Sequence, residues 1–88
     1  MINVRTTTKF DRTFLKFLKK HPELKEVIAN KIDLFINDPM HISLNTHNLK
    51  GALEDCWSFS LTYSYRIIFS WEENDVYFLN IGSHDEVY

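Results

Sequence analysis

Apolar residues recur at helical spacing in the first half of the chain and alternate in the second half. After the short alternating stretch MINVRTT, a helix is predicted to begin at a cap, Thr8. Its apolar face consists of Phe10, Phe14, Phe17 and Leu18. HPEL then indicates a helix restart, with His21 as the cap and Pro22 in the first turn. NDP predicts the end of the second helix. The residues of this helix expected to face the core are Leu24, Val27, Ile28, Ile32 and Phe35.

Beyond residue 40 the pattern is typical of strands. CWSFSLT places Trp57, Phe59 and Leu61 on one face. The β-branched and aromatic stretches YRIIFSW and DVYFLNIG follow, and the polar EEN between them predicts a hairpin turn. HISLNTHNLKGALED predicts a loop with at most a short strand. The order β-α-α-β-β-β predicts one α+β domain over residues 1–88: an N-terminal strand, a two-helix hairpin and a small antiparallel sheet.

Composition supports a globular protein and narrows its class. The chain has 88 residues, of which 44% are apolar. Cys56 is its one cysteine, which excludes an intrachain disulfide and a cysteine-based metal site. The sequence lacks an apolar run of ~18 residues and a signal-peptide pattern at its start, so we expect a cytoplasmic protein without membrane contact.

Charge is divided unevenly along the chain. Residues 1–50 hold nine Lys and Arg against five Asp and Glu, a net +4. Residues 51–88 hold one Arg against seven Asp and Glu, a net −6. The basic half suits nucleic acid or an acidic partner, whereas the total of −2 argues against a strong non-specific nucleic-acid binder.

Two residues stand out as candidates for chemistry. His84 follows the last predicted strand, and Gly82 is expected to let the chain turn there. His84 is either a solvated tail residue or a general acid–base group. Arg66 is the one cation after Lys50; it either faces solvent near acidic neighbours or clamps a phosphate with its fork of donors.

The other candidates have plainer alternatives. Tyr65 and Tyr88 either stack on a nucleobase or pack in the fold. His47 is a surface loop residue or part of a site, whereas His41 and His21 fit loop and cap roles. Histidines and carboxylates do not occur at helical metal-ligand spacing, so we expect no metal and no cofactor.

Three patterns together resemble the RelE/ParE toxin superfamily of type II toxin–antitoxin systems. They are HNLKG at 47–51, YSYRIIF at 63–69 and IGSHDEVY at 81–88, and the resemblance covers essentially the whole chain. It is nearest to the RelE- and YafQ-type mRNA interferases. It implies a RelE-like fold and an antitoxin partner in a hetero-oligomer.

The resemblance also implies roles for individual residues. The catalytic histidine of YafQ-type enzymes falls on His84, and their terminal aromatic residue falls on Tyr88. The histidine before their Leu-x-Gly motif falls on His47. The phosphate-holding strand arginine of RelE-type enzymes falls on Arg66. The chain departs from the pattern where those enzymes have further catalytic or basic residues, at Ser60, Ser64 and Asn80.

On this basis the expected activity is a ribosome-dependent, metal-independent mRNA endonuclease that leaves 2′,3′-cyclic phosphate and 5′-hydroxyl ends. Arg66, helped by Lys50, would stabilise the phosphorane, and His84 would be the acid. His47 is the first candidate for the base and Glu54 the second. Tyr88 and Tyr65 would contact the substrate. Three lysines are expected to dock on ribosomal RNA: Lys16, Lys19 and Lys20.

Three other functions remain compatible with the sequence. The chain could be a ParE-like gyrase poison, although such a protein would have no need of His84 and Tyr88. It could be an inactive relative that only binds antitoxin. It could also be an unrelated small α+β adaptor, if the three motif matches arose by chance.

Overall fold

The computed structural model describes residues 2–50 and 55–87, and for His84 and Glu86 it describes the backbone alone. The chain forms a mixed α+β structure, which confirms the predicted fold class. Its elements are β1 (Asn3–Thr6), α1 (Thr8–Lys20), η1 (Pro22–Leu24), α2 (Lys25–Asn37), η2 (Ile42–Leu44), β2 (His47–Asn48), β3 (Cys56–Ser60), β4 (Tyr65–Glu72), β5 (Asp75–Ser83) and α3 (His84–Val87). No helix in the described part of the chain is long and apolar enough to span a membrane.

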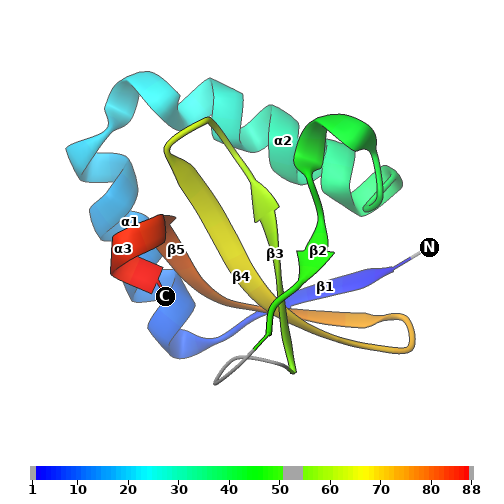
Figure 1. Ribbon diagram of the computed structural model, residues 1–88. Helices are drawn as coiled ribbons and strands as arrows, with labels where there is room; N and C mark the ends of the chain where they lie inside the picture. Colours follow the sequence, from blue (N-terminus) through cyan, green and yellow to red (C-terminus); the bar gives the residue numbers. More distant parts are fainter. Residues whose placement is uncertain (1, 51–54, 88) are drawn as a thin grey trace.

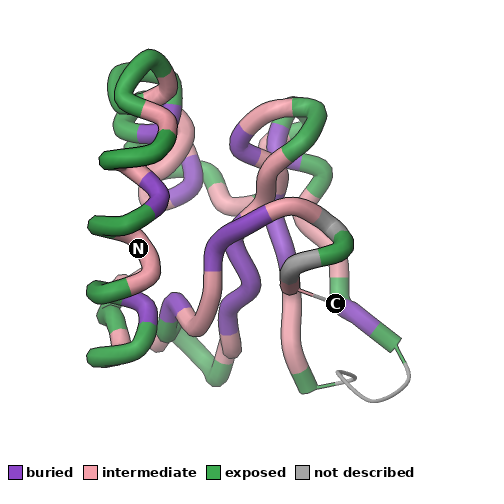
Figure 2. The backbone as a smooth tube through the Cα atoms, turned by 90° about the vertical axis from the view of Figure 1, so that its left-hand side faces the viewer, coloured by how far each residue is buried: buried purple, intermediate pink, exposed green. Residues whose placement is uncertain are grey.

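One five-stranded sheet organises the molecule, in the order β1-β5-β4-β3-β2. Strands β2 to β5 pair antiparallel, as expected. β1 pairs parallel with β5, Asn3 lying beside Asp75 and Thr6 beside Phe78. The first and last strands are therefore neighbours, while α1 and α2 cover one face of the sheet (Figures 1 and 2).

The start of α1 is fixed by Thr7. The Thr7 hydroxyl accepts a hydrogen bond from the Phe10 N–H at 3.1 Å and donates to the Phe78 carbonyl at 3.2 Å. The cap is therefore Thr7, and the expectation of Thr8 was wrong by one residue. One hydroxyl both caps the helix and ties it to β5, which sets the height of α1 on the sheet.

The predicted apolar face of α2 is correct except at one position. Ile28 and Phe35 are buried, and Leu24 and Ile32 pack against the core. Val27, in contrast, is 41% exposed, because it lies at the border of the apolar stripe and faces away from the sheet.

Phenylalanines form the centre of the core. Phe35 of α2 is 0% exposed, and its ring lies 4.2 Å from Phe59, 4.9 Å from Phe69 and 5.9 Å from Phe78, measured between centroids. These three partners come from β3, β4 and β5. The core therefore lies between the helices and the sheet, where Figure 2 shows buried segments on both sides.

An irregularity in the β4–β5 pairing changes the alternation of β5. Ile68 pairs with Asn80 but Phe69 pairs with Phe78, which leaves Leu79 as an extra residue. Phe78 and Ile81 both point to the core although three positions separate them. The bulge thereby allows Gly82, rather than a large side chain, to lie beside Arg66.

Candidate functional site

A row of three residues crosses the sheet at the start of β4: Ser60 pairs with Arg66, and Arg66 pairs with Gly82. Directly paired residues of antiparallel strands share one face of a sheet. The neighbour of Arg66, Ile67, is fully buried in the core, so Arg66 points to the face opposite α1 and α2. Arg66 is partly buried, and its Nε atom is shielded from solvent, so the protein holds the stem of this cation in place.

Gly82 has a different role from the expected one. It does not form a turn, because β5 continues to Ser83 and the chain changes direction only where α3 begins at His84. Gly82 is buried inside the strand. A glycine there leaves the space of a missing side chain next to Arg66, and glycines within strands often mark a place where a ligand or another backbone approaches closely.

His47 lies on the same sheet face as Arg66, one row further along. It pairs with Ser58, and Ser58 pairs with Ile68 of β4. Two strand spacings of about 4.8 Å and one two-residue step of about 6.7 Å put the Cα atoms of His47 and Arg66 about 12 Å apart. Two long side chains and a ribose-phosphate unit can span that separation.

The hydrogen bond of His47 determines which ring nitrogen can act as a base. Its Nδ1 lies 2.8 Å from the carbonyl oxygen of Asn45. A carbonyl oxygen can only accept, so Nδ1 carries the proton and the neutral ring has its lone pair on Nε2. Asn45 adopts a left-handed conformation with φ 48°, which belongs to the turn that presents this carbonyl. The Nε2 atom of the neutral His47 ring is therefore available to accept a proton.

The end of β5 brings the backbone of His84 to the same region. Ser83 pairs with Tyr65, the neighbour of Arg66, and α3 begins with the next residue. The position of His84 along the chain thus agrees with a place beside Arg66, while the role of its side chain stays a prediction. Glu54 and Tyr88, also expected in the site, lie outside the described residues.

Lys50 and Tyr65 are placed away from the Arg66 row. Lys50 is exposed and follows Leu49, whose N–H donates to the Cys56 carbonyl at the opposite end of β3. Tyr65 points to the helix face, where its ring lies 4.9 Å from both Phe17 and His21. This placement favours a packing role for Tyr65.

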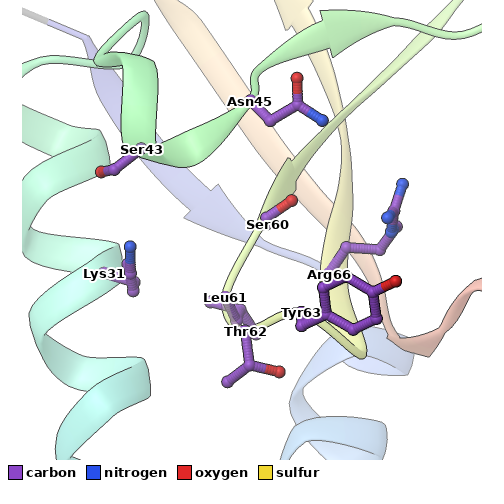
Figure 3. Close-up of a pocket in the computed structure, with 8 residues that line it drawn as sticks. All are labelled: Lys31, Ser43, Asn45, Ser60, Leu61, Thr62, Tyr63 and Arg66. Carbon is purple, nitrogen blue, oxygen red and sulfur yellow. The ribbon is translucent and has the colours of Figure 1, made fainter.

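A pocket of about 550 Å³ adjoins Arg66 at the edge of the sheet (Figure 3). Its lining combines polar and apolar surface and consists of Lys31, Ser43, Asn45, Ser60, Leu61, Thr62, Tyr63 and Arg66. Tyr63 is fully exposed, at 102%. The alternation in TYSY puts Tyr63 and Tyr65 on the same face, so the sequence does not indicate that Tyr63 is the exposed one.

The three lysines expected to dock on ribosomal RNA are exposed, but they do not line one pocket together. Lys16 and Lys20 line a second pocket, of about 290 Å³, together with His21 and Ile81. Lys19 does not line this pocket. Among the described residues no group of three or more His, Cys, Asp or Glu lies where it could hold a metal ion.

Comparison with known proteins assigns the family. The model of the family described as "Bacterial toxin of type II toxin-antitoxin system, YafQ" matches residues 2–88. A search of curated proteins gave no match.

Solved structures share the fold over nearly the whole chain. YafQ from E. coli strain BL21(DE3) has a TM-score of 0.82 at 13% identity, covering 100% of this chain and 99% of that one. A copper-bound mutant toxin from Helicobacter pylori has 0.80 at 19%, covering 100% of both. A YoeB/ParE toxin from Agrobacterium tumefaciens has 0.73 at 16%, covering 94% and 99%. These structures share the fold of this chain, and the family match shows that the chain belongs to the YafQ family of type II toxin–antitoxin toxins.

Proposed function

We propose that this toxin is an endonuclease that cuts messenger RNA on the ribosome without a metal ion. The observation that carries the proposal is that Arg66 and an oriented histidine, His47, lie on the same sheet face, opposite the helices. His84 begins α3 directly after the strand that flanks Arg66. A base, a cation and an acid are the three groups that cleavage by the ribose 2′-hydroxyl needs.

The reaction balances with these groups alone. His47 Nε2 takes the proton of the 2′-hydroxyl, and the 2′-oxygen forms a bond to the adjacent phosphorus. Arg66 stabilises the negative charge of the phosphorane through charge-assisted hydrogen bonds. The bond from phosphorus to the 5′-oxygen then breaks, and protonated His84 gives that oxygen its proton. The products are a 2′,3′-cyclic phosphate and a 5′-hydroxyl.

Two features support action on the ribosome rather than on free RNA. The acidic second half of the chain attracts RNA only weakly. A ribosome that presents the message would compensate for this weak electrostatic attraction. Lys16 and Lys20 lie together at a pocket on α1 and suit phosphates of ribosomal RNA. Action on ribosomes places the protein in the cytoplasm.

An antitoxin partner follows from the family. The E. coli relative YafQ has been solved in complex with DinJ. We expect this toxin to form a corresponding hetero-oligomer with its own antitoxin, which would block the site or the surface that reaches the ribosome.

The decisive experiment compares two histidine variants. His47→Gln can keep a hydrogen bond to the Asn45 carbonyl but cannot accept the proton, whereas His41→Gln changes a histidine that caps η2 through Ser43. Programmed ribosomes and each protein are incubated in magnesium buffer, with and without a chelator selective for transition metals, and new 5′-hydroxyl ends on the message are mapped. His47→Gln should cut about 10²–10⁴-fold more slowly, and His41→Gln should cut as the native chain does.

The same experiment can refute the proposal. Native-like cutting by His47→Gln would remove His47 from the mechanism. Cutting that stops when the selective chelator is present, while magnesium is kept, would refute metal independence, a pertinent point because one solved relative is copper-bound. When the native chain is expressed in cells, growth arrest without new RNA ends would favour a gyrase poison, and no arrest at all would favour an inactive binding protein.

A further inference from the structure

The pocket beside Arg66 lies where the sheet has a short partner strand. β2 pairs only with Trp57 and Ser58 of β3. Beyond them, the described part of the chain pairs Ser60 on one side only, with Arg66. The pocket occupies the space between this edge, α2 and the loop through Asn45 (Figure 3). Its volume of about 550 Å³ lies within the range of about 300–1,000 Å³ typical of ligand sites.

Tyr63 is displayed at the rim of this pocket by a well-defined turn. The Thr62 hydroxyl accepts hydrogen bonds from the N–H groups of Ser64 and Tyr65, both at 3.2 Å. The N–H groups of Leu61 and Thr62 donate to the Tyr65 carbonyl at 2.9 and 3.2 Å. These bonds fix the backbone on both sides of Tyr63, yet the Tyr63 side chain is fully exposed. A rigid turn that holds an aromatic ring in solvent is suited to stacking on a partner.

The charges and polar groups around the pocket match the parts of a nucleotide. Lys31 comes from α2 and Arg66 from β4, and Figure 3 shows them on opposite sides of Ser60. Lys31 makes no ion pair with any described side chain. Two cations on either side of the pocket suit two successive phosphates, and the hydroxyl and amide groups between them suit a ribose and a base edge.

From this arrangement we infer that the pocket binds the nucleotide next to the cleaved bond. Its base stacks on Tyr63, its outer phosphate lies at Lys31, and the scissile phosphate lies at Arg66. The inference rests on the proposed function, since Arg66 is shared. It assigns substrate-binding roles to Tyr63 and Lys31, and a positioning role to Thr62.

Binding of short RNA tests the inference without requiring cleavage. Fluorescein-labelled 2′-fluoro hexanucleotides of adenosine or uridine lack the attacking hydroxyl, and fluorescence anisotropy reports their affinity. Tyr63→Ala should weaken binding about 5- to 150-fold, the range that corresponds to one stacked base. Tyr63→Phe keeps the ring and should bind as the native chain does.

The lysine is tested by the salt dependence of binding. Lys31→Gln should reduce the slope of log affinity against log salt by about 0.7, the amount for one phosphate of a single strand. Lys25→Gln is the matched control, because Lys25 lies on the same helix, is exposed and does not line the pocket. Thermal unfolding is the control for folding, because a variant with a damaged fold would unfold at a lower temperature. These surface variants should unfold at the same temperature as the native chain.

The outcomes separate the subsite from the catalytic assignment. Unchanged RNA binding by both Tyr63→Ala and Lys31→Gln, or no RNA binding by the native chain, overturns the subsite. If these variants instead weaken only the complex with the antitoxin, the pocket is a protein-docking surface and the inference is wrong. If they weaken RNA binding while His47→Gln still cuts normally, the subsite stands and the catalytic role of His47 fails.

Discussion

Replacing Phe35 by alanine should remove a large share of the free energy of unfolding. Phe35 is 0% exposed and packs against three other phenylalanine rings at centroid distances of 4.2, 4.9 and 5.9 Å. Truncating a buried phenylalanine costs about 3–5 kcal/mol, which includes the cavity that remains. The whole domain has roughly 4–13 kcal/mol at 0.05–0.15 kcal/mol per residue. The variant should therefore lie near the limit of folding at physiological temperature.

The loss also has a functional consequence, because Lys31 lies one helical turn before Phe35 on α2. If α2 packs poorly against the sheet, Lys31 moves away from the pocket beside Arg66. RNA binding should then weaken together with stability. This coupling distinguishes Phe35→Ala from Lys31→Gln, which should affect binding alone.

Urea unfolding at low temperature measures the effect. The extrapolated free energy should fall by about 3–5 kcal/mol with an unchanged slope in urea. Leu15→Ala is the control: Leu15 is 60% exposed on α1, and its loss should change the free energy by no more than about 0.5 kcal/mol. A cost below about 1 kcal/mol for Phe35→Ala, or equal costs for the two variants, would refute the assignment of Phe35 to the centre of the core.

Three further predictions concern the site. Arg66→Lys keeps the charge but loses the fork of donors, so single-turnover cutting on ribosomes should slow about 10²-fold; a native rate would exclude a phosphate clamp. Asn45→Val puts a β-branched residue at φ 48° and should lower the free energy of unfolding by about 1–2 kcal/mol in urea titrations, whereas Asn45→Gly should not; equal values would contradict the left-handed turn. Thr62→Val removes the acceptor of the Ser64 and Tyr65 N–H groups, so hydrogen exchange of both amides should speed up; unchanged exchange would show that the turn holds without it.

The sequence correctly predicted those elements in which the spacing of apolar residues along the chain indicates the buried face. The spacing of Phe10 and Phe17 indicated the inner face of α1, and the alternation of Trp57 and Phe59 indicated β3. Periodicity of this kind reports which side of an element faces the core. It fails at the border of a stripe, which is why Val27 was assigned to the core although it is 41% exposed.

The site depended on contacts between distant parts of the chain, which periodicity does not report. Gly82 was expected to form a turn, since a glycine near a strand end has the same local pattern whether the chain turns or continues; its pairing with Arg66 decides between them. The same holds for the two tyrosines of TYSY. The packing of Tyr65 against Phe17 leaves Tyr63 at the exposed position. The orientation of the His47 ring depends on a hydrogen bond to the carbonyl oxygen of a residue in the left-handed conformation. The amino-acid sequence does not reveal that conformation.

The parallel pairing of β1 with β5 has a consequence for the order in which the fold is completed during synthesis. During synthesis, β1 leaves the ribosome first but has no partner until residues 75–78 have emerged. Arg66 likewise lacks Gly82 until β5 has emerged. Contacts between such distant segments form late, because the intervening chain must first close into a loop. A nascent chain therefore holds neither the β1–β5 pairing nor the complete row through Arg66 until β5 has emerged from the ribosome.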